Sequence, residues 1–537
     1  MVIKPEYDYV IIGGGSAGCV LADRLSASGQ HSVLLVEAGS AGRHPSFHIP
    51  IGYVQNRLHP RGNWLYQTQE DMAGRSFFWP RGKVLGGCSA INGLLYIRGQ
   101  GQDYDGWRDL GNAGWGWSDL LPYFIKSERQ QYGADAYHGD AGPLAVEDSS
   151  LRHPVSDAFI EAAKQAGHRF NPDFNGADQE GVGYFQINVR NGRRQSTAVA
   201  YLRRARGRAN LDIVTQAHAE RILFEGRRAS GLRFHRHGVS QEVKANREII
   251  ISAGAVNSPQ LLELSGVGRA ELLQGHGIPV VADLPGVGEN LQDHLIVDLK
   301  YRVRNALSIN EITRGPRLLG QILRYALTRK GLLSMSASHA SVFLKSGPEV
   351  ERPDVQYHFM PATLDKQTNA VERLPGMTCG PCQLRPDSRG SIHIGNGDFR
   401  NHPLIRPNYL EAEQDQTVVV RMLRLGRAIC AQSAIEPYRG EELSPGPALQ
   451  SDDELLDFAR REGRTLYHPA GTCAMGRDRL AVVDSQLRVH QLTGLRVVDA
   501  SIMPTLVSGN TNAPTIAIAE KAAELILADS FTQRLSA

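Results

Sequence analysis

The sequence predicts an α/β fold that begins with a parallel sheet and a crossover helix. Three observations support this prediction: an apolar run at residues 7–12, a glycine-rich turn directly after it, and a helix-like stretch at residues 19–25. A second apolar run at residues 32–36 follows and ends at Glu37. Strand, turn, helix, strand and acidic residue in this order are typical of a Rossmann-like dinucleotide-binding unit.

The glycine-rich turn reads Gly13-Gly14-Gly15-Ser16-Ala17-Gly18. Gly13 permits the tight turn, Gly15 lets the backbone approach a pyrophosphate, and Gly18 lets helix and strand pack closely. Glu37 is placed to accept a hydrogen bond from a ribose hydroxyl. An acidic residue there disfavours the 2′-phosphate of NADP, but the motif does not separate FAD from NAD.

Length, charge and hydropathy indicate a large protein without a membrane span. The 537 residues exceed one usual core, so two domains are expected. The 59 basic and 56 acidic residues are nearly balanced, which gives no case for a nucleic-acid partner. The first apolar run is the predicted strand itself, and no run of about eighteen apolar residues is present. A cytoplasmic protein is therefore expected.

The cysteines suggest neither a disulfide framework nor a redox site. Six in the whole chain are too few for a disulfide scaffold. Cys379 and Cys382 have thioredoxin-like spacing, but Pro386 and Gly390 exclude the long helix that such a motif needs. We expect Cys382 to lie on a strand that leads to a turn. No cluster has metal-ligand spacing, so no metal is predicted.

Two interior segments are rich in small residues. Residues 81–93 suit a backbone that lies flat against a planar or phosphate-bearing ligand. Residues 248–268 predict a buried strand, a small-residue crossing and a helix that opens near Pro259. A further helix is expected from Thr515, with Pro514 in its first turn.

Two residues near the C-terminus suggest chemistry. His468 offers an imidazole that can take a proton near neutral pH, and Asn510 offers a neutral amide that can hold an alkoxide. Each is a weak signal alone. Together with a bound hydride acceptor they suit the oxidation of an alcohol.

On these segments the chain resembles the glucose-methanol-choline (GMC) oxidoreductases, FAD enzymes that oxidise alcohols. Residues 82–92 and 254–268 resemble the two signature patterns of the family, and residues 284–294 resemble another family stretch. The likeness extends from Tyr7 to about Ile526 and is greatest to the bacterial alcohol dehydrogenase branch, which includes choline-dehydrogenase-like enzymes.

The resemblance implies roles for individual residues. His468 matches the catalytic base and Asn510 its partner. The implied cofactor is FAD, and the residues matched to its site are Gly13, Gly15, Ser16, Gly18, Glu37, Ala38, Val84, Gly87, Asn92, Gly93, Ala219, Ser252, Asp499, Ala500 and Asn512.

The resemblance also implies two interleaved domains. A Rossmann-like FAD-binding domain would comprise residues 1–150, 192–300 and 467–537. An α+β substrate-binding domain built on an antiparallel sheet would comprise residues 151–191 and 301–466.

Some positions depart from the family pattern. Ile91 stands where some members attach FAD through a histidine, so non-covalent FAD is expected. His339 stands where choline-oxidising members carry a glutamate, which makes choline a poor candidate. His358, on a predicted half-buried strand, is a second candidate for contact with the substrate. His294 is expected to serve local hydrogen bonding.

The resulting hypothesis is oxidation of an alcohol, in particular a primary one, to the aldehyde. His468 takes the hydroxyl proton, hydride passes to flavin N5, and a quinone, a dye or oxygen accepts the electrons. The alternative is a lyase of the hydroxynitrile type that keeps FAD structurally. The sequence leaves open which alcohol is used, the oligomeric state, and peripheral contact with the inner face of a membrane.

Overall fold

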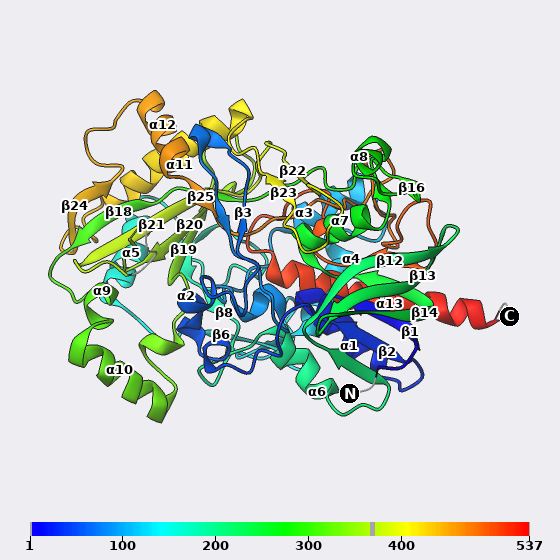
Figure 1. Ribbon diagram of the computed structural model, residues 1–537. Coiled ribbons are helices and arrows are strands. Elements are labelled where there is room, and N and C mark those ends of the chain that lie inside the picture. Colours follow the sequence, from blue (N-terminus) through cyan, green and yellow to red (C-terminus); the bar gives the residue numbers. More distant parts are fainter. Residues whose placement is uncertain (1–2, 366–370, 536–537) are drawn as a thin grey trace.

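The computed structural model describes residues 3–365 and 371–535, with side chains up to residue 529. Two sheets form the two halves of the molecule and lie side by side (Figure 1). The termini both belong to one half, shown in blue and red at the right of Figure 1. The predicted α/β fold is therefore confirmed.

The first sheet contains the predicted dinucleotide-binding unit. Its order is β11-β2-β1-β14-β13-β12, and β26 also pairs with β14. Pairing is parallel from β11 through β14 and between β14 and β26, whereas β12, β13 and β14 pair antiparallel. The strands are β1 (Glu6–Ile12), β2 (Val33–Val36), β11 (Leu211–Val214), β12 (Ala217–Glu225), β13 (Arg228–Arg236), β14 (Val239–Ile251) and β26 (Leu495–Val497).

Two helices from opposite ends of the chain cover this sheet together. α1 (Ser16–Ser26) packs against α13 (Asn512–Leu535), and α13 packs in turn against α4 (Trp117–Ser127). Arg24 on α1 forms an ion pair of 2.7 Å with Glu520 on α13. Pro514 lies in the first turn of α13, as the sequence predicts. The last helix of the chain thus completes the unit that the first strand begins.

The second sheet is antiparallel and forms the other half. Its order is β24-β18-β21-β20-β19-β7, and β17 joins β21 to β25. The strands are β7 (Gly181–Tyr184), β17 (Leu295–Ile296), β18 (Leu299–Val303), β19 (Ala340–Leu344), β20 (Val355–Met360), β21 (Gly376–Gln383), β24 (Arg439–Ser444) and β25 (Arg464–Thr465).

Helices pack on this second sheet and at its edge. α5 (Pro154–Gln165) and α11 (Glu413–Cys430) contact its strands, and α12 (Asp452–Glu462) packs on α11. At the lower left of Figure 1, the short α9 (Ile309–Ile312) leads into α10 (Gly315–Thr328), which projects from the body. The one-turn η6 (Leu332–Ser334) follows α10 and packs against it.

Smaller elements complete the chain. The remaining helices are α2 (Tyr53–Asn56), α3 (Gly101–Asp109), α6 (Arg203–Ala205), α7 (Gly254–Leu264) and α8 (Ala270–Gly275). The remaining strands are β3 (Tyr66–Gln67), β4 (Phe78–Trp79), β5 (Glu128–Gln130), β6 (Leu144–Asp148), β8 (Gln186–Ile187), β9 (Val189–Arg190), β10 (Arg193–Arg194), β15 (Val267–Gly268), β16 (Ala282–Asp283), β22 (Ser391–His393) and β23 (Leu404–Arg406).

The structure differs from the sequence prediction at the start of α7. The helix begins at Gly254, five residues before Pro259, where the sequence placed its opening. Proline has no N–H to bond the carbonyl oxygen of Ala255, four residues earlier. The hydroxyl of Thr472 donates to that oxygen instead, at 2.7 Å. This replacement donor lets the helix run through its proline.

Two other expectations concern residues of the second sheet. Besides β7, the second sheet includes β17 at Leu295 and the start of β18 at Leu299, which precede residue 301, where the predicted substrate-binding range resumes. Cys382 lies on β21 together with Cys379, and both are buried free thiols. The strand placement expected for Cys382 is confirmed.

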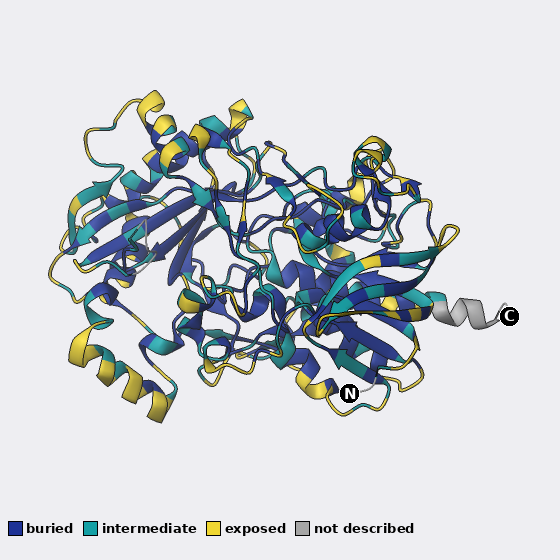
Figure 2. Cartoon of the chain, viewed as in Figure 1, coloured by how far each residue is buried: buried dark blue, intermediate teal, exposed yellow. Residues whose placement is uncertain are grey.

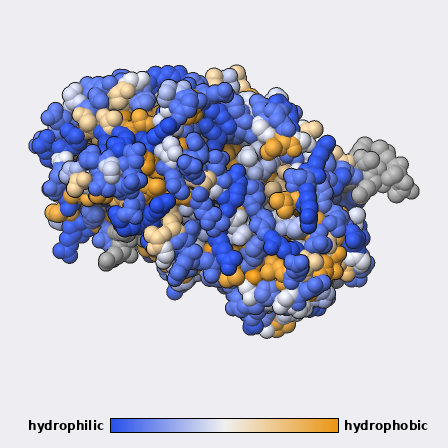
Figure 3. Space-filling view, turned by 90° about the horizontal axis from the view of Figure 1, so that it is seen from above, coloured by the Kyte–Doolittle hydropathy of each residue, from blue (hydrophilic) through white to orange (hydrophobic). Residues whose placement is uncertain are grey.

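The buried residues form a core behind each sheet, and exposed residues lie on loops and on outer helices such as α10 and α12 (Figure 2). The face seen in Figure 3 is mostly hydrophilic, with apolar side chains scattered among the polar ones. None of the described helices combines the length and the hydropathy that a membrane crossing requires.

Candidate active site

A cavity of about 490 Å³ lies between the two sheets. Ile12 and Val36, at the ends of β1 and β2, line it on one side, and His358 and Met360 on β20 line it on the other. Ligand sites in doubly wound folds lie at the carboxyl ends of parallel strands, which is where this cavity begins.

The glycine-rich turn forms the end of the cavity nearest the first sheet. Gly13 has φ +100°, and a Cβ there would lie 2.5 Å from the carbonyl oxygen of Ser252. At Gly15 a Cβ would only touch the carbonyl oxygen of Ser252 at 3.9 Å and Cα of Gly87 at 4.0 Å, so the backbone is not crowded. No side chain caps α1, whose first N–H groups remain available to an anion. These features fit a bound pyrophosphate.

Glu37 lies at the end of β2 and lines the same part of the cavity. Its carboxylate oxygens accept hydrogen bonds from the N–H groups of Gly14 at 2.8 Å and Gly39 at 2.6 Å. Burial raises the pKa of this carboxyl above its usual range. Each oxygen keeps a second lone pair, so the carboxylate can still accept from a ribose hydroxyl.

Most of the residues predicted to bind FAD line the cavity. They are Gly13, Gly15, Ser16, Glu37, Ala38, Gly87, Asn92, Gly93, Ala219, Ser252, Asp499, Ala500 and Asn512. Gly18 and Val84 lie behind this wall. A Cβ at Gly18 would lie 1.9 Å from the carbonyl oxygen of Gly13, so its role is close packing rather than ligand contact.

Several polar atoms of lining residues are buried without a partner among the described residues. They are the hydroxyl of Ser252, Nε2 of His358 and Oδ1 of Asn510. Buried polar groups are nearly always hydrogen-bonded. Their distribution along the cavity therefore fits a long polar ligand such as FAD together with a second, smaller molecule.

His468 and Asn510 meet in this cavity although 42 residues separate them in the sequence. Nδ2 of Asn510 lies 3.0 Å from Nε2 of His468, and both residues line the cavity. An amide Nδ2 is a donor, so Nε2 of His468 accepts and holds a lone pair at the cavity. The histidine is thus in the form that can take a proton.

His294 explains why His468 adopts this tautomer. Nε2 of His294 donates to the carbonyl oxygen of Leu384 at 2.9 Å, which leaves its Nδ1 as an acceptor. That Nδ1 lies 2.9 Å from Nδ1 of His468. The proton between them is therefore on Nδ1 of His468, and Nε2 of His468 is left unprotonated. The local hydrogen bonding expected for His294 is directed at the predicted base.

Asp293 holds the backbone of His468. Its Oδ1 accepts from the N–H of His468 at 2.7 Å, and its Oδ2 accepts from the hydroxyls of Thr465 and Tyr409, both at 2.5 Å. Burial raises the pKa of this carboxyl. Sequence reasoning did not assign Asp293 a role, although it lies in the 284–294 family stretch beside His294.

The environment keeps His468 uncharged. Burial lowers its pKa well below the usual value, and His294, His358 and Arg81 add to the effect. Burial likewise lowers the pKa of His294 to about 4. His468 is therefore neutral, and able to accept a proton, throughout the neutral pH range.

The two histidines proposed to contact the substrate lie in different places. His358 lines the cavity, its ring stacks on Phe185 at 5.6 Å, and burial lowers its pKa to about 3. His339 is not among the lining residues, and its Nδ1 lies 3.3 Å from the hydroxyl of Ser156. Its neighbours Ala337 and Ser338 line the cavity instead.

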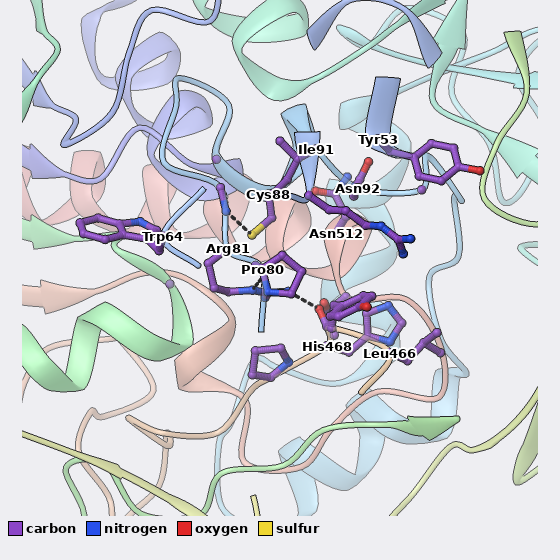
Figure 4. A pocket seen from close by; sticks show the side chains of 18 of the residues that line it. Tyr53, Trp64, Pro80, Arg81, Cys88, Ile91, Asn92, Leu466, His468 and Asn512 are labelled. Carbon is purple, nitrogen blue, oxygen red and sulfur yellow. Dashed lines mark hydrogen bonds between the residues drawn. The ribbon is translucent and has the colours of Figure 1, made fainter. Parts of the chain in front are cut away.

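Ile91 lies on the cavity wall, close to Cys88 and Asn92 (Figure 4). In this view His468 lies below that group, with Arg81 between. Arg81 donates to the carbonyl oxygen of Tyr467 at 2.7 Å and so fixes the chain beside the base. Ile91 offers no nucleophile toward the cavity. Among the described residues, no group of His, Cys, Asp or Glu side chains has the arrangement of a metal site.

Comparison with known proteins identifies the family. The GMC oxidoreductase model matches residues 7–296, and a second model of the same description matches residues 386–519. An alcohol dehydrogenase [acceptor] of Pseudomonas putida is 45% identical over 97% of this chain and 96% of its own length. The mitochondrial choline dehydrogenase of Mus musculus is 42% identical over 97% of this chain and 90% of its own.

Among solved structures, pyridoxine 4-oxidase from Mesorbium loti superposes with a TM-score of 0.88 at 33% identity. The match covers 96% of this chain and 98% of that one. The two relatives cover nearly the whole chain, whereas the family models cover the cavity residues of the first sheet together with His468 and Asn510. The chain therefore belongs to the GMC oxidoreductase family and is an FAD-dependent oxidoreductase.

Proposed function

We propose that this oxidoreductase converts an uncharged primary alcohol to the aldehyde. The observation that carries the proposal is the unprotonated Nε2 of His468, which accepts from the amide of Asn510 in the cavity that the dinucleotide motif opens into. The named relatives act as dehydrogenases or an oxidase, and none of these three is a lyase. The lyase alternative therefore has no observation in its favour.

His468 acts as the base in this proposal. Its Nε2 accepts the hydroxyl proton of the alcohol, and its Nδ1–H stays bonded to His294, so the ring does not turn during the transfer. The neutral resting state follows from the burial that lowers its pKa. Once protonated, the imidazolium lies next to the alkoxide it has produced and stabilises it.

Asn510 positions the alcohol oxygen. Its Nδ2 donates to Nε2 of His468 in the structure. When an alcohol oxygen comes to lie against both side chains, the same N–H can donate to that oxygen and hold the developing negative charge. A neutral amide can do this without raising the charge of the cavity.

Bound FAD supplies a two-electron acceptor for the hydride that leaves the carbinol carbon. The glycine-rich turn, the uncapped start of α1, Glu37 and Ser252 would hold its nucleotide part. Residues 87–93 would lie along its ring system. Because Ile91 has no nucleophile, we propose that the FAD is held non-covalently.

The cavity lining beyond the catalytic pair favours an apolar alcohol over choline. Ile51, Ile309, Met335, Met360 and Ala362 provide apolar side chains there. A quaternary ammonium would need an unpaired carboxylate or an aromatic cage. Of the carboxylates that line the cavity, Asp298 is paired with Arg464 at 3.0 Å, Glu37 and Asp499 accept from backbone N–H groups, and Asp365 and Glu462 also have partners.

The electrons then pass to a quinone-like acceptor or to oxygen. All six cysteines are free thiols, which suits the reducing cytoplasm. Peripheral contact with the inner face of a membrane would bring the cavity close to a lipid-soluble quinone.

Anaerobic bleaching of the flavin tests the proposal. The purified enzyme is mixed with aliphatic, aromatic, polyol and amino alcohols, and the flavin absorption is followed. Bleaching by long-chain aliphatic or aromatic alcohols, with weak response to choline, is expected. Readmission of oxygen or a quinone analogue then identifies the acceptor. Absence of bleaching by every alcohol would refute the proposed reaction.

A further inference from the structure

An amphipathic helix carries its apolar side chains toward solvent. α10 projects from the edge of the second sheet (Figure 1) and is exposed along most of its length (Figure 2). Leu319, Ile322, Leu323 and Leu327 recur at helical spacing and so form one stripe. Leu319 is 68% exposed and Leu327 is 76% exposed. Leaving such a stripe in water is unfavourable unless it has a partner.

The opposite face of α10 attaches it to the protein. Tyr325 is buried and donates its hydroxyl proton to the carbonyl oxygen of Gly192 at 2.8 Å. Leu318 packs against the apolar cluster of Ile309, Leu332 and Met335. The helix is therefore anchored on one side, and the apolar stripe is the side that it presents outward.

All the charged side chains in and beside α10 are basic. The segment from Arg314 to Lys330 contains five basic residues and no acidic one. The basic residues are Arg314, Arg317, Arg324, Arg329 and Lys330. No ion pair joins any of them to a carboxylate in the part of the chain that the structure describes. Arg314 donates to the carbonyl oxygen of Val371, and Arg329 lies 5.3 Å from the ring of Tyr325.

We infer that α10 docks on an anionic lipid bilayer, lying in its surface with the leucine stripe among the acyl chains. A short basic helix with a strong apolar face is the sequence pattern of such surface-bound segments. Anionic head groups would neutralise the five cations. A second copy of the chain is a poorer partner for this face, because two sets of five unpaired cations would meet.

The cavity adjoins the docked helix. Ile309 and Thr313, just before α10, and Met335, just after η6, line the cavity. A bilayer against α10 would therefore lie next to the apolar end of the cavity, where a lipid-soluble alcohol or quinone could enter. This last step rests on the proposed function, whereas the docking itself does not.

Vesicle flotation of the holoenzyme without substrate tests the docking. The protein is incubated with vesicles of phosphatidylcholine and phosphatidylglycerol, or of phosphatidylcholine alone, at low and high salt. We expect binding to the anionic vesicles that weakens with salt, since exposed charges are screened. The triple variant Leu319→Gln/Leu323→Gln/Leu327→Gln keeps helix propensity and should bind at least about tenfold more weakly.

Two further variants complete the experiment. Leu110→Gln/Val239→Gln/Leu480→Gln removes three other exposed apolar side chains and should bind like the unmodified enzyme. Arg317→Gln/Arg324→Gln should bind more weakly and show a smaller salt effect. All variants should retain flavin and reduce a water-soluble dye at the unmodified rate, which separates docking from catalysis.

Three results would overturn the inference. The first is that the unmodified enzyme does not bind anionic vesicles. The second is that the α10 triple variant binds them as well as the unmodified enzyme. The third is that the control variant Leu110→Gln/Val239→Gln/Leu480→Gln loses as much vesicle binding as the α10 triple variant. If the unmodified enzyme is a dimer that does not bind vesicles, and the α10 triple variant is a monomer, the stripe is an interface with a second copy instead. Failure of alcohol to bleach the flavin would affect the proposed reaction but leave the vesicle result unchanged.

Discussion

Nδ1 of His294 lies 2.9 Å from Nδ1 of His468, and the hydrogen bond from His294 to the carbonyl oxygen of Leu384 determines which of the two Nδ1 atoms is protonated. Because His294 must donate its other N–H to that carbonyl, His468 donates through Nδ1 and keeps Nε2 unprotonated. One backbone carbonyl thus sets the protonation of the proposed base through an intervening histidine.

Replacing His294 should slow alcohol-dependent flavin reduction without removing the flavin. His294→Leu removes the acceptor for Nδ1–H of His468, and the rate in anaerobic stopped flow should fall about 10- to 100-fold. His294→Asn can still present an oxygen near the position of Nδ1 and should lose less. Equal loss in both variants would mean that His294 only fills space beside His468.

Removing the base itself should have a larger effect. His468→Ala should reduce the flavin about 10²–10⁴-fold more slowly while FAD stays bound. His339→Asn is the matched control, since His339 is also a buried histidine of low pKa but does not line the cavity. It should keep the unmodified rate. Near-normal reduction in His468→Ala would reject the assignment of the base.

The pH dependence of flavin reduction should reflect the lowered pKa of His468. A general base loses activity as pH falls through its pKa. Since burial holds that pKa well below 6.5, the rate should stay level as pH falls through 6.5. Rapid-mixing measurements over the acid range, with flavin fluorescence to check folding, would show this. A rate that halves near 6.5 would indicate that His468 titrates as an ordinary histidine.

FAD should leave the protein when the chain is denatured. Acid precipitation is expected to leave all flavin in the supernatant, because Ile91 provides no attachment point. Cys88 is the nearby residue that could contradict this, since its thiol belongs to a lining residue. A yellow pellet that becomes colourless in Cys88→Ser would show a thioether link and refute the non-covalent prediction.

Local patterns predicted the parts of the site that are close in sequence. Residues 7–37 form the expected strand, turn, helix and strand, because the spacing of apolar residues and glycines is decided within about thirty residues. The pairing of His294 with His468 joins residues 174 apart and leaves no periodicity to detect. The first turn of α7 receives a hydrogen bond from the hydroxyl of Thr472, which is 217 residues from its acceptor Ala255. His339 was placed by alignment alone, and it is not among the residues that line the cavity.

The meeting of the two chain ends bears on biosynthesis. β26, which pairs with β14, and α13, which packs on α1, are synthesised after the other strands and α-helices described here. A nascent chain that stops before residue 495 lacks a strand next to β14, the partner helix of α1 and also Asn510. The flavin-binding half therefore closes only once β26 and α13 have joined the strands and helix made at the start of synthesis.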